Sequence, residues 1–262
     1  MTWQGGEFGR RARCVLAPNA SPMTLDGTNT WVLREPGARC SVVIDPGPLD
    51  LGHLEAVGEV AEDVAVVLLT HGHADHSAGA REFAERVGCG VRALDPAFQY
   101  GGEGLRDGDV IEVGGLEVKV VATPGHTGDS LSFVVSADRA VLTGDTVLGR
   151  GTTVVAHPDG ELGAYLGSLR RLRDLVEARD VETVWPGHGP VLDQALLVLD
   201  YYLAHRAERL EQVREAVAAG FVQPVDVVRR VYADVDQQLW PAAELSVRAQ
   251  LEYLRGCGTA AD

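Results

Sequence analysis

The chain has 262 residues, 45% of them hydrophobic, which is enough for one large domain, or for one domain with a smaller one beside it. Its formal net charge of -15 at pH 7 disfavours strong nonspecific binding to nucleic acid or to an anionic membrane. The sequence contains no apolar run of about eighteen residues, no signal-peptide pattern and no C-x-x-C pair, so we expect no membrane span and a reduced, cytoplasmic protein.

Strands dominate the expected structure up to about residue 190, with helices between some of them. Gly114 and Gly115 separate two of these strands and indicate a two-residue hairpin turn. Short runs rich in β-branched and aromatic residues, bounded by turn residues, predict strands at 13–17, 30–34, 40–44, 64–69, 91–93, 110–113, 116–121, 131–135, 140–143 and 181–185. Helices are expected at 51–61, 77–87 and 161–178, the second of them closed by Gly88.

From Asp193 onward the pattern becomes helical. A long helix ending near Gly220 precedes two shorter helical segments at 224–232 and 242–255. We therefore expect a large domain over 1–200 and a small helical domain over 201–262. Because residues 221–262 carry four arginines against six acidic residues, we expect this tail to pack over a cleft or to form a homodimer contact rather than to bind nucleic acid.

The most informative stretch is T-H-G-H-A-D-H at residues 70–76. It follows a buried strand and precedes a helix, so its side chains lie on a turn where they can converge. Imidazole and carboxylate groups together suit a divalent metal ion. A polar loop that happens to be rich in histidine is the alternative, which the H-x-H-x-D-H spacing at the end of a buried strand disfavours.

Three further candidate ligands stand just after apolar strands. They are His126, Asp145 and His188, and each has glycine beside it, which permits tight turns and close approach of the backbone. Because strands of one sandwich end along common edges, we expect these residues to meet the 70–76 turn. The sequence thus predicts one site with five histidines and two aspartates.

These motifs resemble the metallo-β-lactamase-fold hydrolases over roughly residues 13 to 192. The resemblance rests on T-H-G-H-A-D-H at 70–76, P-G-H-T at 124–127, G-D-T at 144–146 and P-G-H-G-P at 186–190. Within that superfamily the chain is most similar to the endoribonuclease-type branch of β-lactamase-like protein 2. The features that support this branch are the segments 24–31 and 149–153, His205-Arg206, and a winged-helix-like tail.

The resemblance implies an α+β fold, a four-layer αβ/βα sandwich with a small helical, winged-helix-like C-terminal domain and two metal ions at one edge. It also implies a nucleophilic hydroxide between the ions, and Asp75 would orient this hydroxide or shuttle its proton. Zinc is the expected metal, with manganese or iron as alternatives. The implied ligands are His71, His73 and His126 for the first ion, Asp75, His76 and His188 for the second, and Asp145 as a bridge.

Other residues are candidates for supporting roles. Asp45 and Thr70 are expected to hydrogen-bond to the ligands, since a metal-bound imidazole usually donates its other N–H; a plain turn residue is the alternative for Asp45. Arg150 is a weak candidate for binding an anionic substrate, with an ordinary ion pair as its alternative. His157 is a weak candidate for lining the cleft, and His53 is expected at the surface.

Three functions fit this pattern. The first is a hydrolase of small acyl esters or thioesters, and the second is an endoribonuclease directed at single-stranded RNA, as the branch resemblance implies. The third, a binding module with a degraded site, is disfavoured because all seven ligand positions are filled. The acidic tail favours the small-molecule hydrolase over the ribonuclease.

Overall fold

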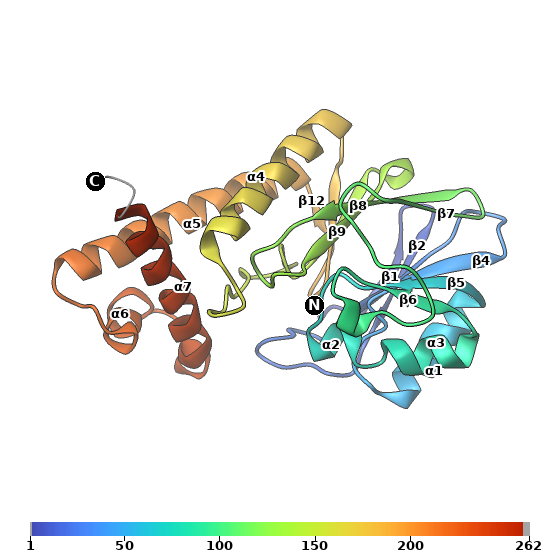
Figure 1. The fold of residues 1–262 in the computed structure, drawn as a ribbon, viewed down its shortest axis with the longest axis horizontal. Coiled ribbons are helices and arrows are strands. Elements are labelled where there is room, and N and C mark those ends of the chain that lie inside the picture. Colours follow the sequence, from blue (N-terminus) through green and yellow to red (C-terminus); the bar gives the residue numbers. More distant parts are fainter. Residues whose placement is uncertain (1, 259–262) are drawn as a thin grey trace.

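The computed structural model describes residues 2–258 and contains two facing six-stranded sheets with helices on their outer sides. Helices α1 and α3 cover one sheet, α4 and α5 cover the other, and α6 and α7 lie beyond the second pair (Figure 1). This arrangement confirms the predicted α+β class and the four-layer sandwich.

The first sheet has the order β1-β2-β3-β4-β5-β6 and the second β12-β11-β10-β9-β8-β7. In the first sheet, the strands are β1 (Gly6–Phe8), β2 (Ala12–Leu16), β3 (Asn29–Leu33), β4 (Cys40–Ile44), β5 (Asp63–Leu68) and β6 (Gly90–Arg92). In the second, they are β7 (Val110–Val113), β8 (Leu116–Ala122), β9 (Leu131–Val135), β10 (Ala140–Gly144), β11 (Thr183–Pro186) and β12 (Leu192–Asp193). The central neighbours β4 and β5, and likewise β10 and β11, are parallel, so each pair ends at the same edge of its sheet.

The helices are α1 (Leu51–Ala61), α2 (Ala74–Ser77), α3 (Ala80–Val87), α4 (Leu162–Arg179), α5 (Ala195–Ala218), α6 (Pro224–Val231) and α7 (Trp240–Gly258). Short 3-10 turns lie at Pro96–Phe98, Ser136–Asp138 and Gln237–Leu239. None of the helices within 2–258 is long and apolar enough to cross a membrane.

The elements agree with the sequence patterns except where tertiary contacts act. The helix expected at 77–87 is two helices, α2 and α3, separated at Gly79. This glycine donates its N–H to the carbonyl of Gly47 at 3.0 Å, and a Cβ there would lie 2.8 Å from the carbonyl oxygen of Pro48. Contact with the neighbouring loop therefore interrupts the helix. The sequence also gave no signal for the edge strands β1 and β12, which are only three and two residues long.

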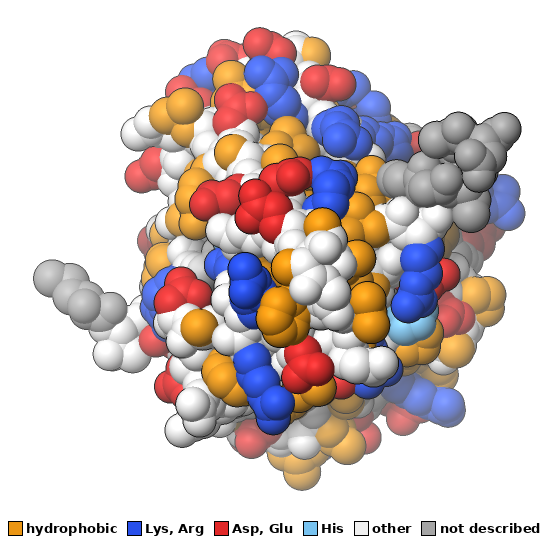
Figure 2. Space-filling model, turned by 90° about the vertical axis from the view of Figure 1, so that its left-hand side faces the viewer, with side chains coloured by type: hydrophobic (Ala, Val, Ile, Leu, Met, Phe, Trp, Pro, Cys, Tyr) orange, Lys and Arg blue, Asp and Glu red, His pale blue; other side chains and the backbone are white. Residues whose placement is uncertain are grey.

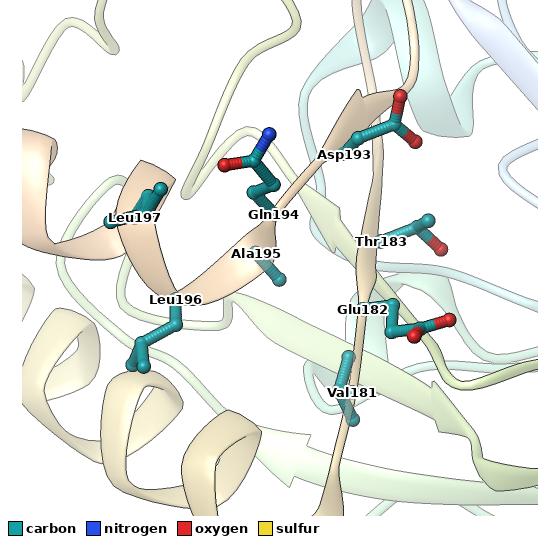
Figure 3. Close-up of a pocket in the computed structure, with 8 residues that line it drawn as sticks. All are labelled: Val181, Glu182, Thr183, Asp193, Gln194, Ala195, Leu196 and Leu197. Atoms are coloured by element: carbon teal, nitrogen blue, oxygen red, sulfur yellow. The ribbon is translucent and has the colours of Figure 1, made fainter.

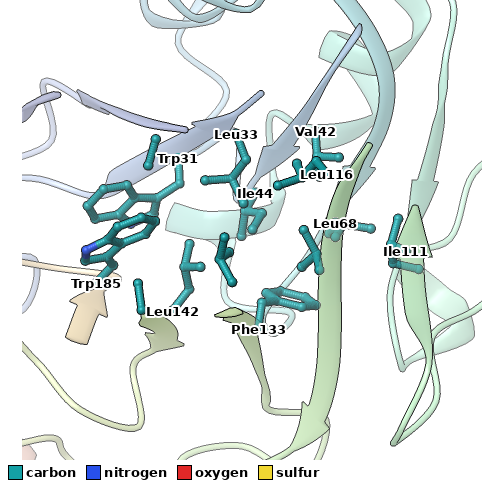
Figure 4. Packing of buried hydrophobic residues seen from close by; sticks show 14 of the residues in the cluster. Trp31, Leu33, Val42, Ile44, Leu68, Ile111, Leu116, Phe133, Leu142 and Trp185 are labelled. Carbon is teal, nitrogen blue, oxygen red and sulfur yellow. The ribbon is translucent and has the colours of Figure 1, made fainter. Parts of the chain in front are cut away.

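The main core fills the space between the two sheets (Figure 4). Trp31 of β3 stacks on Trp185 of β11 with their ring centroids 5.2 Å apart, and Phe133 of β9 is fully buried. The alternation of side chains along each strand sends these residues inward and their neighbours out to the helices. The contact between the sheets fixes how their loops meet at the edge.

Helix α5 belongs to two hydrophobic clusters. Its first half packs with α4 against the second sheet, and Val213 and Ala216 near its end pack with α6 and α7. The expected boundary between residues 200 and 201 falls inside this continuous helix. The division into domains at that position stays a prediction.

We expect Phe133→Ala to lower the free energy of unfolding by about 3–5 kcal/mol, because it leaves a cavity between two rigid sheets. Leu197→Ala is the control, since Leu197 is 61% exposed and its truncation should change stability by less than about 0.5 kcal/mol. Urea denaturation measures both. A loss below about 1 kcal/mol for Phe133→Ala would show that the sheets close around the gap.

Candidate metal centre

The seven predicted ligands lie together at one edge of the sandwich. The turn from β5 into α2 carries His71, His73, Asp75 and His76. The other three follow the ends of β8, β10 and β11, and they are His126, Asp145 and His188. Three overlapping groups of these side chains have all their ligand atoms within 4.8 Å of one another.

The first group contains His71, His73 and His126. Nδ1 of His73 lies 3.0 Å from Nε2 of His71 and 3.0 Å from Nε2 of His126. Three ring nitrogens that face one another cannot all be paired by hydrogen bonds among themselves. A cation between them would accept all three lone pairs. The donor set therefore fits a divalent metal ion.

The second group contains Asp75, His76 and His188. Nε2 of His188 lies 3.2 Å from Nε2 of His76 and 3.1 Å from Oδ2 of Asp75. Asp145 lies between the two groups, with Oδ2 3.3 Å from Nε2 of His188 and 3.7 Å from Nε2 of His126. Its Oδ1 is buried without a hydrogen-bond partner among the described residues, as expected for an oxygen that binds a cation.

The outward-facing nitrogens of the imidazoles are held by hydrogen bonds. Nδ1 of His126 donates to the carbonyl of Val154 at 2.8 Å, and Nδ1 of His188 donates to the carbonyl of Gly27 at 3.2 Å. Nδ1 of His76 lies 2.8 Å from Oδ2 of Asp45. These contacts leave Nε2 of each ring free to face the site.

Asp45 joins the two loops that follow β4 and β5. Its Oδ1 accepts the backbone N–H of Thr70 at 2.8 Å, and its Oδ2 accepts the Thr70 hydroxyl at 2.6 Å as well as His76. Because that hydroxyl hydrogen is used, His71 Nδ1 donates to Thr70 Oγ1 at 3.0 Å. Asp45 and Thr70 thus hydrogen-bond to candidate ligands, and their role in supporting a bound metal stays a prediction.

Close backbone approach explains two of the glycines. A Cβ at Gly187 would lie 2.5 Å from Oδ1 of Asp145, so any side chain there would displace the carboxylate. Gly144 has a φ of 48°, and a Cβ there would lie 2.7 Å from Cβ of Thr70. Both turns need glycine to bring their neighbouring ligands together.

The charges of the cluster perturb one another in the metal-free protein. Burial lowers the pKa of His71 well below its usual value. Burial also opposes the charged form of His188, but the Asp145 carboxylate outweighs it and raises the pKa of His188 to about 9. Burial would raise the pKa of Asp145, yet the rings of His188 and His76 hold it well below its usual range.

The weaker candidates are less closely connected to the cluster. Arg150 forms an ion pair with Asp26 at 3.0 Å. His157 lies in the loop before α4, where its backbone N–H contacts the carbonyl of Leu245 in α7 at 3.5 Å. Their substrate-binding roles stay predictions.

His53 is not at the surface, and that expectation was wrong. It is 4% exposed, and its Nε2 lies 2.9 Å from the hydroxyl of Thr30, which donates to the carbonyl of Asp45. Burial lowers the pKa of His53, which keeps it neutral. The loop after β4 folds back over the start of α1 and covers a residue whose local sequence looks exposed.

Two contributors to the site were not singled out individually from the sequence. Thr28 Oγ1 lies 3.4 Å from Oδ2 of Asp75. Asn29 Nδ2 donates to the carbonyls of Pro186 and Gly189, at 2.9 and 2.8 Å, and so holds the turn that carries His188. Both belong to the 24–31 segment that supported the branch resemblance, which was the available signal.

A separate groove of about 440 Å³ lies between β11, β12 and the start of α5 (Figure 3). Its lining includes Val181, Glu182, Ala195 and Leu196, and it contains none of the seven candidate ligands. The groove therefore does not belong to the candidate metal centre.

Facing sheets whose loops gather imidazoles and carboxylates at one edge define a metal-dependent hydrolase. Residues 23–188 match the metallo-beta-lactamase superfamily, and residues 224–260 match the beta-lactamase associated winged helix domain. The chain belongs to the metallo-β-lactamase superfamily and carries this winged-helix domain after it. Both parts of the predicted resemblance are confirmed.

Individual relatives agree with this assignment. A beta-lactamase-like protein 2 homolog from Caenorhabditis elegans is 31% identical over 92% of this chain and 82% of its own length. An atrochrysone carboxyl ACP thioesterase from Aspergillus fumigatus is 32% identical over 76% of this chain and 62% of its own length. A metallo-beta-lactamase family protein from Thermus thermophilus superposes with a TM-score of 0.77 at 22% identity, covering 95% of this chain and 94% of that one.

We expect metal binding at pH 7 to release about one proton or more per chain, because imidazole binds metals in its neutral form and His188 has a metal-free pKa of about 9. Affinity should therefore rise as the pH increases toward 9 and weaken as it falls. Calorimetric titration in buffers of different ionisation enthalpy measures the released protons. His157→Ala, outside the cluster, should release as many protons as the wild type; no release from the wild type would contradict the prediction.

Proposed function

We propose that the chain is a dinuclear metal-dependent hydrolase that cleaves a small acyl ester or thioester. The observation that carries the proposal is the convergence of the seven side chains, whose ligand atoms form three overlapping groups with Asp145 close to both His126 and His188. We assign the other six to two sets: His71, His73 and His126 in one, and Asp75, His76 and His188 in the other. Each set offers three donor groups besides Asp145, as a divalent ion requires. We propose zinc as the metal, with manganese and iron as alternatives.

Two divalent ions held there supply Lewis acidity, which activates water and polarises a carbonyl group. The protein's own contribution is to fix the seven side chains and to manage protons. Asp75 suits the second task because its side chain is 29% exposed, whereas that of Asp145 is 12% exposed.

The charge of the segment from residue 221 onward, called here the C-terminal unit, supports a small substrate over a nucleic acid. Three of its four arginines pair with acidic residues one helical turn away, as Arg229 does with Asp226 and Arg248 with Glu244. Basic and acidic side chains are both present over the face that Figure 2 shows. A winged helix that reads nucleic acid needs a basic face.

The relatives support the acyl substrate as well. One is named an atrochrysone carboxyl ACP thioesterase, and we extend the thioesterase reaction class, though not that substrate, to this chain. The unpaired Cys14, Cys40 and Cys89 fit a reducing compartment such as the cytoplasm. The side chain of Cys257 lies outside the described residues.

Cleavage of single-stranded RNA is the second candidate function. The observation in its favour is that a beta-lactamase-like protein 2 homolog matches 92% of the chain, including the region of the winged-helix domain. A phosphodiester and a thioester both present an oxygen to a Lewis acid, so the metal centre alone does not separate them.

Metal analysis followed by parallel assays tests the proposal. We expect protein prepared without chelator, or reconstituted with zinc or manganese, to hold about two metal ions per chain and to hydrolyse acyl-thioesters faster than single-stranded RNA. Well under one metal equivalent after reconstitution would refute the dinuclear centre. RNA cleavage without thioester hydrolysis, with salt-sensitive RNA binding that is lost on deletion of 221–262, would favour the second candidate.

Excess metal should restore the activity of an Asp45 variant but not that of an Asp75 variant. Asp75→Asn should lower hydrolysis about a hundredfold or more, the scale of a lost general base. Asp45→Asn should weaken metal affinity roughly ten- to a hundredfold, because it removes a charged acceptor from Thr70 and His76. Excess metal should restore the activity of Asp45→Asn and leave Asp75→Asn impaired. Equal restoration of both would mean that Asp75 acts only as a ligand.

A further inference from the structure

Arg206 of α5 is a buried cation outside the candidate ligand set. It is 7% exposed, and none of the carboxylates within 2–258 lies within 4.0 Å of its guanidinium nitrogens. Its Nε is buried without a hydrogen-bond partner among the described residues, beside a small void lined also by Arg209, Ser246 and Gln250. Burying an uncompensated guanidinium is costly, which indicates that its particular contacts matter.

The contacts of Arg206 lead from α5 to the turn of Asp145. Its Nη2 donates to the carbonyl of Thr153, and its guanidinium lies over the ring of Tyr165, 4.9 Å from the centroid. The Thr153 hydroxyl donates to the carbonyl of Asp145 at 2.5 Å, and the Tyr165 hydroxyl donates to the carbonyl of Thr146 at 2.7 Å. Arg206 therefore contacts Thr153 and Tyr165, whose hydroxyls bind the backbone carbonyls of Asp145 and the next residue.

The same contacts lead to His126. The residue after Thr153 is Val154, whose carbonyl accepts the hydrogen bond from Nδ1 of His126. The backbone of Tyr165 also packs against Gly125, the residue before His126. A Cβ at Gly125 would lie 2.3 Å from the backbone nitrogen of Tyr165. Two of the seven candidate ligands, from different strand ends, thus depend on one pair of residues beneath Arg206.

We propose that Arg206 is a positioning residue through which α5 fixes Asp145 and His126, and with them the ion bound by His71, His73 and His126. The inference rests on the proposed dinuclear centre. The other set, Asp75, His76 and His188, depends on contacts that Arg206 does not make, with Asp45, Gly27 and Asn29. Loss of Arg206 therefore weakens most the ion bound with His126, and it affects the other ion only through Asp145.

Arg209 gives a matched control on the same helix. It also donates to a backbone carbonyl, that of Val231, and its guanidinium also lies over a tyrosine, Tyr232, 4.5 Å from the centroid. Both partners belong to the C-terminal unit and neither touches the metal centre. Arg206→Met and Arg209→Met remove the same chemistry, and methionine keeps much of the apolar stem in place.

The experiment titrates metal-free full-length proteins with Zn²⁺ against a chelator and follows the histidine ring signals by ¹⁵N NMR. We expect the wild type and Arg209→Met to bind two equivalents with similar affinities. Arg206→Met should bind one equivalent about ten- to a hundredfold more weakly, the scale of a lost supporting contact, and the other with a smaller loss that arises through Asp145. The more strongly weakened equivalent should be the one that shifts the His126 signal.

Three results would overturn the inference. The first is wild-type affinity of Arg206→Met for both equivalents, and the second is an equal loss of affinity for both. The third is weakening of the same equivalent by Arg209→Met, which would reflect a general loosening of the C-terminal unit. If Arg206→Met does not fold, Arg206→Lys keeps the charge without the planar group and should show the same selective loss at a smaller scale. A wild type that binds fewer than two equivalents would instead refute the proposed dinuclear centre.

Discussion

The candidate centre depends on one geometric constraint, the packing of two sheets face to face. The seven side chains come from four separate turns, and no local interaction within a turn brings one turn to another. The stacked rings of Trp31 and Trp185 and the buried residues around them join β3 to β11, and this contact sets the distance between the loops of the two sheets. The hydrophobic core thus brings these imidazoles and carboxylates together, and its packing offsets the free energy that their burial costs.

Much of this arrangement could be predicted from the sequence because the signals are local. The apolar runs that end in histidine or aspartate mark strand ends, and glycine beside them marks sharp turns, so the ligand types and their common edge followed directly. Asp45 was also within reach, because a carboxylate at the end of a neighbouring strand is well placed to accept from an imidazole. These predictions needed only the period of a strand and the hydrogen-bonding habits of metal-bound histidine.

The parts that could not be predicted depend on residues distant in the chain. His53 is buried because the loop after β4 covers it, and nothing within α1 itself indicates this. The break at Gly79 reflects the approach of Gly47 and Pro48, which are about thirty residues earlier in the chain. In the sequence, Arg206 stood out only as part of the His205-Arg206 pair that supported the branch resemblance, and only the tertiary structure shows that it is buried between Thr153 and Tyr165.

Asp45 has a φ of 50°, in the left-handed region, while its carboxylate makes three hydrogen bonds. The backbone requirement favours glycine, asparagine and aspartate, and the chemical requirement favours a short, charged acceptor. Glycine meets only the first requirement, glutamate is too long for the second, and asparagine lacks the charge. Among these four residues only aspartate meets both requirements, so each of the other three would impair either the backbone or the hydrogen bonds. Relatives that keep the site should therefore keep aspartate at this position, and substitutions should accumulate at neighbouring positions whose backbone is unconstrained.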